Sequence, residues 1–260
     1  MTEICPYIQF YSTCTWEYLS EVFSYRLKGS ELGFTDDLVF RIVQFYKGRP
    51  SDCEVYAFSD NVRESIRGAD IDLFIQDTET GRYQYFMLQA KVMDHNGRYK
   101  DIRKWSYNAQ FNRLIRAAHK EGAFPLYLLY NGLTGRSTVG NTHWGLSIVE
   151  AARVRTLRHN QRKLNKAPYI TFDDLHPLNM QPFHLLFCDI DSNNYNLPPT
   201  IDGRNVYTGF PYVIKKYDTR EEQVDDSKSP VAIDEGLAII GNRNLAPVRI
   251  VIKSYEVFRI

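Results

Sequence analysis

Apolar and polar positions in the first part of the chain follow a helical spacing and then a strand-like one. In residues 15–28 the apolar side chains recur every three or four positions, which predicts a helix. A second, mostly buried helix is predicted over residues 38–45, with Thr35 or Asp36 as its N-cap. Residues 53–58 (CEVYAF) then predict a short strand.

The next part of the chain predicts two strands joined by a turn. Residues 69–76 and 82–92 are strand-like, and residues 78–81 (TETG) between them have the composition of a turn. Because successive side chains of a strand point to opposite faces, Asp70 and Asp72 are expected to share one face. The pattern therefore predicts a β-hairpin that carries two acidic side chains on one side.

Helices and strands also alternate in the rest of the chain, which predicts a layered α/β domain. The predicted elements are helices over 106–120 and 146–158, buried strands over 124–131 and 183–190, and a final strand over 248–258.

The composition changes near residue 191. Residues 191–236 are rich in Asn, Pro, Asp and Gly, which is typical of an exposed loop. We therefore expect one domain over residues 1–190, followed by a loop-rich C-terminal extension over residues 191–260 that packs on the same domain.

The overall composition is that of a globular protein without membrane segments. Of the 260 residues, 43% are hydrophobic and 24% are charged, which is ordinary for a chain with its own core. No run of about 18 apolar residues could span a membrane, and the first residues lack the pattern of a secretion signal. We expect a cytoplasmic protein with no membrane partner, whose four cysteines stay reduced. A Cys5–Cys14 disulfide is the alternative.

A net charge of +1 hides a strongly basic middle segment. Residues 95–166 hold 14 basic and three acidic side chains, whereas the segments on either side are net acidic. A polyphosphate partner such as nucleic acid would neutralise this charge, and the alternative is a solvated face paired with acids from elsewhere in the fold. The candidate nucleic-acid contacts in this segment are Arg153, Arg155, Arg158, Arg162 and Lys163.

Polar side chains on the predicted hairpin have the chemistry of a metal site. Gln89 and Lys91 are two residues apart, so they share a strand face as Asp70 and Asp72 do. Carboxylate and amide oxygens suit Mg²⁺, which also takes water and phosphate oxygens. A lysine beside them would orient the attacking water and stabilise charge on a phosphate. Asp70, Asp72 and Gln89 are therefore the candidate ligands of Mg²⁺ or Mn²⁺, with Lys91 as their catalytic neighbour.

These residues also have ordinary structural interpretations. Asp70 and Asp72 could be acids at a strand entry that face solvent or pair with Arg67. Lys91 could be an edge-strand lysine that prevents aggregation. The constellation as a whole favours the metal site over these alternatives.

Residues 68–91 resemble the restriction-endonuclease-like PD-(D/E)XK superfamily, in its Gln-x-Lys (Mrr-like) variant. The shared features are a Gly-x-Asp entry at Asp70, an apolar strand, a turn, and the tripeptide 89–91 (QAK) on the next strand. The resemblance implies a restriction-endonuclease-like core of the order αβββαβ, with a mixed central sheet flanked by helices. It also implies a site role for Glu31, which matches the family's glutamate on an N-terminal helix.

The resemblance implies a metal-dependent endonuclease that hydrolyses phosphodiester bonds, in DNA rather than RNA, with a role in bacterial defence against foreign DNA. Gln89 stands where the family usually has an acid, so the alternative is a catalytically inactive module that binds nucleic acid or a protein partner. Gln110, near the start of the following helix, is a further candidate contact to phosphate. His143 could assist proton transfer, and association into a homo-oligomer is left open.

Overall fold

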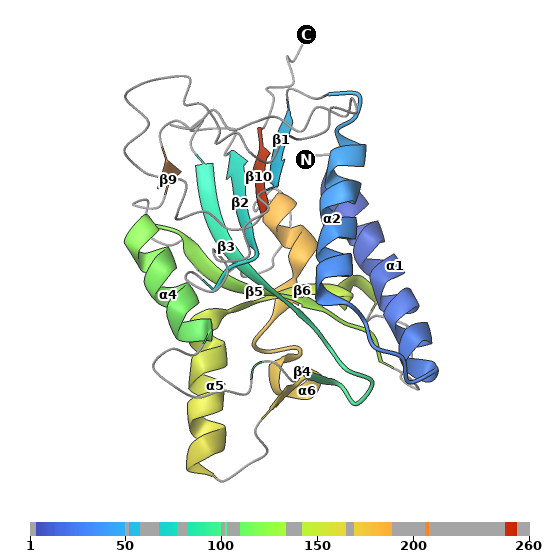
Figure 1. Cartoon of the computed structure of the whole chain (residues 1–260), viewed down its shortest axis with the longest axis vertical. Helices are drawn as coiled ribbons and strands as arrows, with labels where there is room; N and C mark the ends of the chain where they lie inside the picture. Colours follow the sequence, from blue (N-terminus) through green and yellow to red (C-terminus); the bar gives the residue numbers. More distant parts are fainter. Residues whose placement is uncertain are drawn as a thin grey trace, which may run out of the picture.

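We describe the fold from a computed structural model of the chain (Figure 1). Among the residues described, no helix is long and apolar enough to cross a membrane. The described residues are 4–49, 52–57, 68–76, 83–99, 102, 110–133, 142–164, 169–188, 206–207 and 248–253.

A mixed β-sheet forms the centre of the described structure (Figure 1). Its strands are β1 (Cys53–Ala57), β2 (Ile71–Gln76), β3 (Tyr83–Val92), β5 (Phe124–Tyr130), β6 (Leu146–Glu150), β8 (Gln181–Pro182), β9 (Val206–Tyr207) and β10 (Val248–Ile252). They are arranged in the order β1-β10-β2-β3-β5-β6-β8, and β9 pairs with β3. The pairs β10–β2 and β3–β5 are parallel, and the other pairs are antiparallel.

Helices lie on both sides of this sheet, so the predicted α/β class is confirmed. The helices are α1 (Ile4–Ser24), α2 (Glu31–Phe45), α4 (Gln110–Glu121), α5 (Ala151–Lys163) and α6 (Phe172–Leu175), with 3₁₀ turns η1 (Thr142–Trp144) and η2 (Phe183–Phe187). In Figure 1, α1 and α2 lie on one side of the sheet, and α4 and α5 lie on the other. A small second sheet pairs β4 (Arg98–Tyr99) with β7 (Ile170–Thr171).

The helix before the sheet begins earlier than its apolar pattern predicted. α2 starts at Glu31, and Ser30 is its N-cap, because the Ser30 hydroxyl accepts a hydrogen bond from the Gly33 N–H at 3.2 Å. Thr35, the expected cap, is buried inside the helix and donates to the Glu31 carbonyl at 2.9 Å. Among the described residues, the chain then runs α2, β1, β2, β3, β4, α4, β5, and the restriction-endonuclease-like core stays a prediction.

Two apolar segments adopt a different structure from the one predicted. Residues 146–158, expected to be a helix, divide into β6 and the first part of α5. Residues 183–190, expected to be a strand, form η2 as far as Phe187. The Phe183 and Phe187 rings pack edge to face at 5.2 Å. A short apolar run fits a strand or a buried helical turn, so its spacing alone does not separate them.

The C-terminal strand lies inside the sheet. β10 pairs antiparallel with β1 and parallel with β2, and Ile250, Val251 and Ile252 are buried. Residues 248–252 therefore belong to the core of the domain rather than to an appended layer. The rest of the predicted extension up to this strand, apart from β9, lies outside the described residues.

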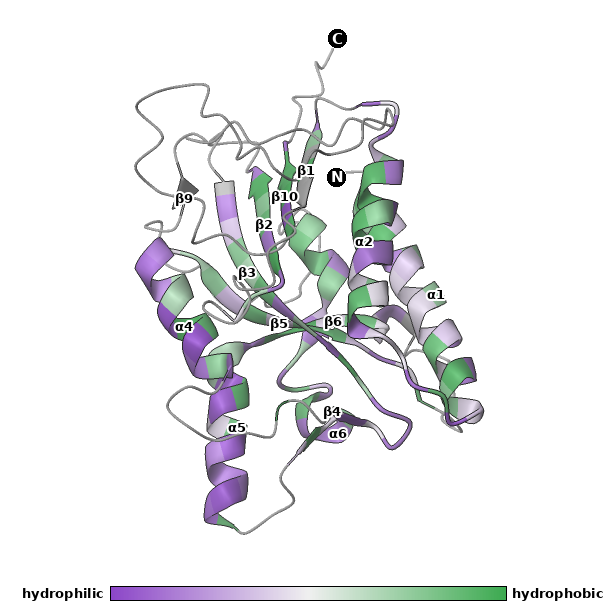
Figure 2. Cartoon of the chain, viewed as in Figure 1, coloured by the Kyte–Doolittle hydropathy of each residue, from purple (hydrophilic) through white to green (hydrophobic). Residues whose placement is uncertain are grey.

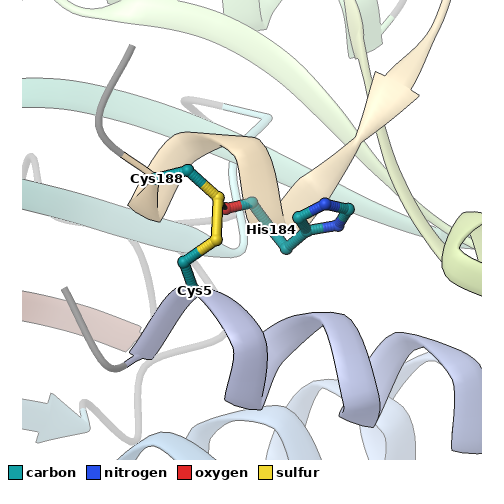
Figure 3. The surroundings of a disulfide bond; sticks show 3 residues. All are labelled: Cys5, His184 and Cys188. Carbon is teal, nitrogen blue, oxygen red and sulfur yellow. Dashed lines mark hydrogen bonds between the residues drawn. A yellow bond between two sulfur atoms is a disulfide. The ribbon is translucent and has the colours of Figure 1, made fainter. Parts of the chain in front are cut away.

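A disulfide joins the first turn of α1 to the residue after η2 (Figure 3). Cys5 and Cys188 are 183 residues apart in the sequence, and their Cα atoms lie 5.1 Å apart. The prediction of four reduced cysteines is therefore wrong for this pair, and so is the alternative Cys5–Cys14 bridge. Cys14 and Cys53 keep their thiols.

Candidate functional site

The β2 strand is entered through a glycine that lies against α4. Gly68 has a φ of 72°, in the left-handed region that favours glycine. A Cβ atom here would lie 2.9 Å from the backbone oxygen of Gln110 and 3.3 Å from the backbone nitrogen of Leu114. The Gly-x-Asp pattern therefore reflects a close approach between this segment and the first turns of α4.

Both the main chain and the carboxylate of Asp70 are hydrogen-bonded. Its N–H donates to the Leu88 carbonyl at 2.8 Å, and its carbonyl accepts from the Val248 N–H at 3.1 Å. Its Oδ2 accepts from the Ala90 N–H at 2.7 Å and from the side-chain amide of Gln89. The structure therefore brings Asp70 and Gln89 into direct contact.

The nitrogen and the oxygen of the Gln89 side-chain amide differ in their hydrogen bonds. The side chain is 0% exposed, and its Nε2 donates to Asp70 and, at 3.4 Å, to the Ala90 carbonyl. Its Oε1 is buried without a hydrogen-bond partner in the described part of the chain. Because leaving a buried acceptor unsatisfied is costly, this oxygen marks a position suited to water or a cation.

Lys91 is buried and paired with Glu31. Its Nζ donates to the Glu31 Oε1 at 2.7 Å, and only 4% of the residue is exposed. A buried lysine requires such a partner. Glu31 is the first residue of α2, where the helix dipole favours a carboxylate. The first turn of α2 thus supplies an acid to the strand that carries Gln89.

Asp72 lies on β2, and its carboxylate has other partners. Its Oδ1 accepts from the Tyr85 hydroxyl at 2.8 Å, and its Oδ2 lies 3.4 Å from the Nη2 of Arg249. Asp72 is 0% exposed and Arg249 is 3% exposed, so this ion pair is buried. The Tyr85 hydroxyl also lies 3.3 Å from the Glu121 carboxylate. Asp72 was expected beside Asp70 as a metal ligand, but these contacts instead connect β2 with β3, β10 and α4.

Two buried tyrosines on β5 lie within the electrostatic field of the site. Burial raises the pKa of Tyr127 and of Tyr130 well above the usual range, because it disfavours the phenolate. The carboxylates of Asp70 and Glu31 raise both pKa values further, whereas Arg113 on α4 lowers that of Tyr127. Tyr127 and Arg113 were not among the predicted site residues. The position of Arg113, one turn into the helix after the motif, was the available signal.

The donor set fits a divalent cation that keeps much of its water. Asp70 offers a carboxylate and Gln89 an amide oxygen without a partner, and both are hard ligands. Mg²⁺ commonly binds through one or two carboxylates and retains several waters. Within the described segments, no group of three His, Cys, Asp or Glu side chains is arranged to hold a metal. The residues therefore suit Mg²⁺ or Mn²⁺ better than a metal that needs a cage of protein ligands.

The predicted basic surface lies on α5, most of whose length is hydrophilic (Figure 2). Arg155, Arg162 and Lys163 are exposed. Arg153 is exposed as well, with its Nε 3.9 Å from the Glu150 carboxylate. Exposed ion pairs of this kind are weak, so Arg153 can still reach an external phosphate.

Arg158 does not belong to that surface. It is 5% exposed, its Nη1 donates to the Gln161 Oε1 at 2.7 Å, and burial lowers its pKa. A contact between Arg158 and nucleic acid would require this buried guanidinium to become exposed, and the contact stays a prediction. Gln110 is the first residue of α4 and is half-buried. Two exposed cations that the prediction omitted, Arg116 and Lys120, lie on the same helix, which packs against α5.

His143 lies beside aromatic side chains of η1 and η2. Its ring centroid is 6.3 Å from that of His184 and 5.4 Å from that of Trp144. Burial lowers the pKa of both histidines, to about 4 for His184, where His143 adds to the effect. The His184 imidazole points away from the neighbouring disulfide (Figure 3). These contacts give no support to His143 as a proton-transfer group beside Asp70.

Fold and site together define an α/β protein with an Asp70–Gln89 contact between the β2 entry and β3, and a half-buried Lys91–Glu31 pair between β3 and α2. The chain belongs to the Family of unknown function (DUF6615), whose model matches residues 4–252. The match runs from α1 through β10, so the C-terminal strand lies within the extent of the family. Neither the curated proteins nor the solved structures contain a match.

Proposed function

We propose that this protein is a Mg²⁺-dependent nuclease that hydrolyses phosphodiester bonds in DNA. The observation that carries the proposal is the part-buried Asp70–Gln89 contact on the strand that also carries Lys91, with a Gln89 amide oxygen that has no hydrogen-bond partner among the described residues. A carboxylate and an amide oxygen can bind Mg²⁺, and a lysine can stabilise charge in metal-assisted phosphodiester hydrolysis.

Each residue has a distinct role in this proposal. Asp70 and Gln89 would hold Mg²⁺ or Mn²⁺, which when bound polarises a phosphoryl oxygen and lowers the pKa of water. Lys91 would orient the attacking water and stabilise the negative charge that develops on the phosphate. Glu31, at 2.7 Å from the Lys91 Nζ, holds the ammonium group in place.

The exposed cations of α5 would hold the DNA backbone. Arg153, Arg155, Arg162 and Lys163 form a surface that counterion release would favour for a polyphosphate. The choice of DNA over RNA, and a role in bacterial defence, rest on the resemblance to restriction endonucleases alone.

A second candidate function is a nuclease-like module that binds nucleic acid or a protein partner without catalysis. It is favoured by the neutral Gln89 at the position of an acid and by the ion pair that occupies Asp72. With one carboxylate at the metal site, affinity for Mg²⁺ is lower than with two. Salt-dependent DNA binding without cleavage would support this function.

Cleavage of supercoiled plasmid by the purified full-length chain tests the proposal. With Mg²⁺ or Mn²⁺ the wild-type chain should nick or linearise the plasmid, and EDTA should abolish cleavage. Lys91→Met and Asp70→Asn should each lower the rate by about a hundredfold or more, since each removes a charge that acts in the transition state. Circular dichroism would verify that both variants fold.

Lys47→Met is the matched control, because Lys47 is an exposed lysine just after α2. It should cleave at the wild-type rate. Equal cleavage by wild type and Lys91→Met would mean that the assigned site is wrong or that the activity is a contaminant.

A further inference from the structure

We propose that Asp72 is not a metal ligand but the anchor for Arg249, and that Arg249 positions Asp70 through the C-terminal strand β10. Arg249 would thus be a positioning residue, 158 residues beyond Lys91 in the sequence. The part of this inference that concerns metal binding rests on the proposed function, whereas the part that concerns the geometry of Asp70 does not.

β10 holds the backbone of Asp70 directly. The Val248 N–H donates to the Asp70 carbonyl at 3.1 Å, while the Leu88 carbonyl accepts from the Asp70 N–H at 2.8 Å. Asp70 is therefore held between β10 on one side and β3 on the other. Without β10, the peptide that carries the candidate ligand would lose its hydrogen bond from Val248.

The next residue of β10 makes the contact that fixes this pairing. Arg249 is the Cα partner of Asp72 in the parallel β10–β2 ladder, and its Nη2 lies 3.4 Å from the Asp72 Oδ2. Its guanidinium also lies 5.0 Å from the centroid of the Phe74 ring. Because a one-residue slip would turn Arg249 to the other face of the sheet, the ion pair specifies the register of β10.

Asp72 is held equally firmly on its other side. The Tyr85 hydroxyl donates to its Oδ1 at 2.8 Å, and the Tyr85 ring stacks on Phe74 with centroids 4.1 Å apart. Asp72 is 0% exposed, so these hydrogen-bond and ion-pair partners fix the position of its carboxylate. Because its carboxylate contacts Tyr85 and Arg249, Asp72 anchors the strand. Asp70 is the acid that contacts Gln89.

Substitutions at both Asp72 and Arg249 can distinguish an anchoring role of Asp72 from a role as a metal ligand. If Asp72 is an anchor, Arg249→Met removes the guanidinium from this buried ion pair, and a second substitution, Asp72→Asn, makes the other partner neutral as well and restores the packing. If Asp72 is a ligand, Asp72→Asn removes metal binding both alone and in combination with Arg249→Met.

The test compares four proteins: wild type, Arg249→Met, Asp72→Asn and the double variant. Hydrogen exchange of residues 68–76 is measured without metal. Binding of Mn²⁺ is measured by titration followed by electron paramagnetic resonance. Arg249→Met should speed exchange of this segment by about tenfold or more and weaken Mn²⁺ binding by a similar factor. The double variant should recover both to within about threefold of wild type. Should Arg249→Met fail to fold, recovery of folding in the double variant tests the same coupling.

Arg41→Met is the matched control, because it breaks an exposed arginine–aspartate pair, Arg41 with Asp37 at 3.4 Å. It should change neither measurement. Unchanged exchange in Arg249→Met would overturn the positioning role, and loss of Mn²⁺ binding in both Asp72→Asn and the double variant would make Asp72 a ligand. If the wild-type chain binds no Mn²⁺ and cleaves no DNA, the proposed function fails, while the exchange data still decide whether β10 positions Asp70.

Discussion

At the scale of single residues, the entry to the site depends on a glycine that no other residue can replace without strain. Gly68→Ala would impose a φ of 72° on an alanine, at a cost of about 1–2 kcal/mol. It would also place a Cβ 2.9 Å from the backbone oxygen of Gln110. We expect Gly68→Ala to lower the free energy of unfolding by about 2 kcal/mol or more and to lower DNA cleavage, because Asp70 is two residues away.

Urea unfolding measures this effect, and Gly33→Ala is its control. Gly33 lies within α2, where a Cβ would meet the Ser30 side chain only at ordinary contact distances of 3.5 Å and beyond. An alanine there should stabilise the helix by up to about 1 kcal/mol. Equal effects of the two substitutions would contradict the close approach between Gly68 and α4.

Local sequence pattern predicted some of the site and could not predict the rest. The two-residue spacing of Gln89 and Lys91 follows from strand periodicity, and the structure does bring Gln89 to Asp70. The same periodicity correctly put Asp72 on a shared face but could not reveal its partner. Arg249 is 177 residues away, and that contact exists only because β10 enters the sheet beside β2.

At the scale of elements, α5 is expected to be the helix that binds DNA. Substituting alanine for the three exposed cations Arg155, Arg162 and Lys163 should weaken binding to duplex DNA by about tenfold or more at moderate salt. The slope of log K against log salt should become shallower by about 0.9 for each phosphate that these side chains neutralise in the wild-type complex. Titrations of labelled DNA followed by fluorescence anisotropy at several salt concentrations measure both quantities.

A triple variant of equal charge change provides the control for this prediction. Arg26, Lys28 and Lys47 are exposed beside α1 and α2, away from α5 (Figure 1). Their replacement by alanine should leave the slope near that of the wild-type chain. If both triple variants weaken binding equally, net charge rather than α5 determines DNA affinity.

The elements themselves were predicted most accurately where a turn signal separates two apolar runs. β2 and β3 begin within two residues of their predicted starts, and residues 78–81 between them have the composition of a turn. Residues 146–150 and 183–187 are short, mostly buried runs that form a strand and a 3₁₀ turn. In such runs tertiary packing decides between strand and helical turn.

At the scale of the whole molecule, contacts between segments far apart in the sequence complete the fold. β10 closes the gap between β1 and β2, and the Cys5–Cys188 disulfide ties α1 to η2. Neither feature could be predicted from composition or spacing, because each pairs segments separated by most of the chain. Both suggest that the chain acquires its stability as one cooperative unit.

The disulfide permits a direct test of that view. Cross-linking residues 183 positions apart restricts the unfolded chain strongly, so Cys5→Ser with Cys188→Ser should lower the free energy of unfolding by about 2–5 kcal/mol under oxidising conditions. Reductant should have the same effect on the wild-type chain and none on the double variant. Cys14→Ser, which alters a half-exposed thiol, is the control and should unfold in urea as the wild type does. Thiol titration in denaturant should find two reactive thiols before reduction and four after it, and four before reduction would contradict the bond.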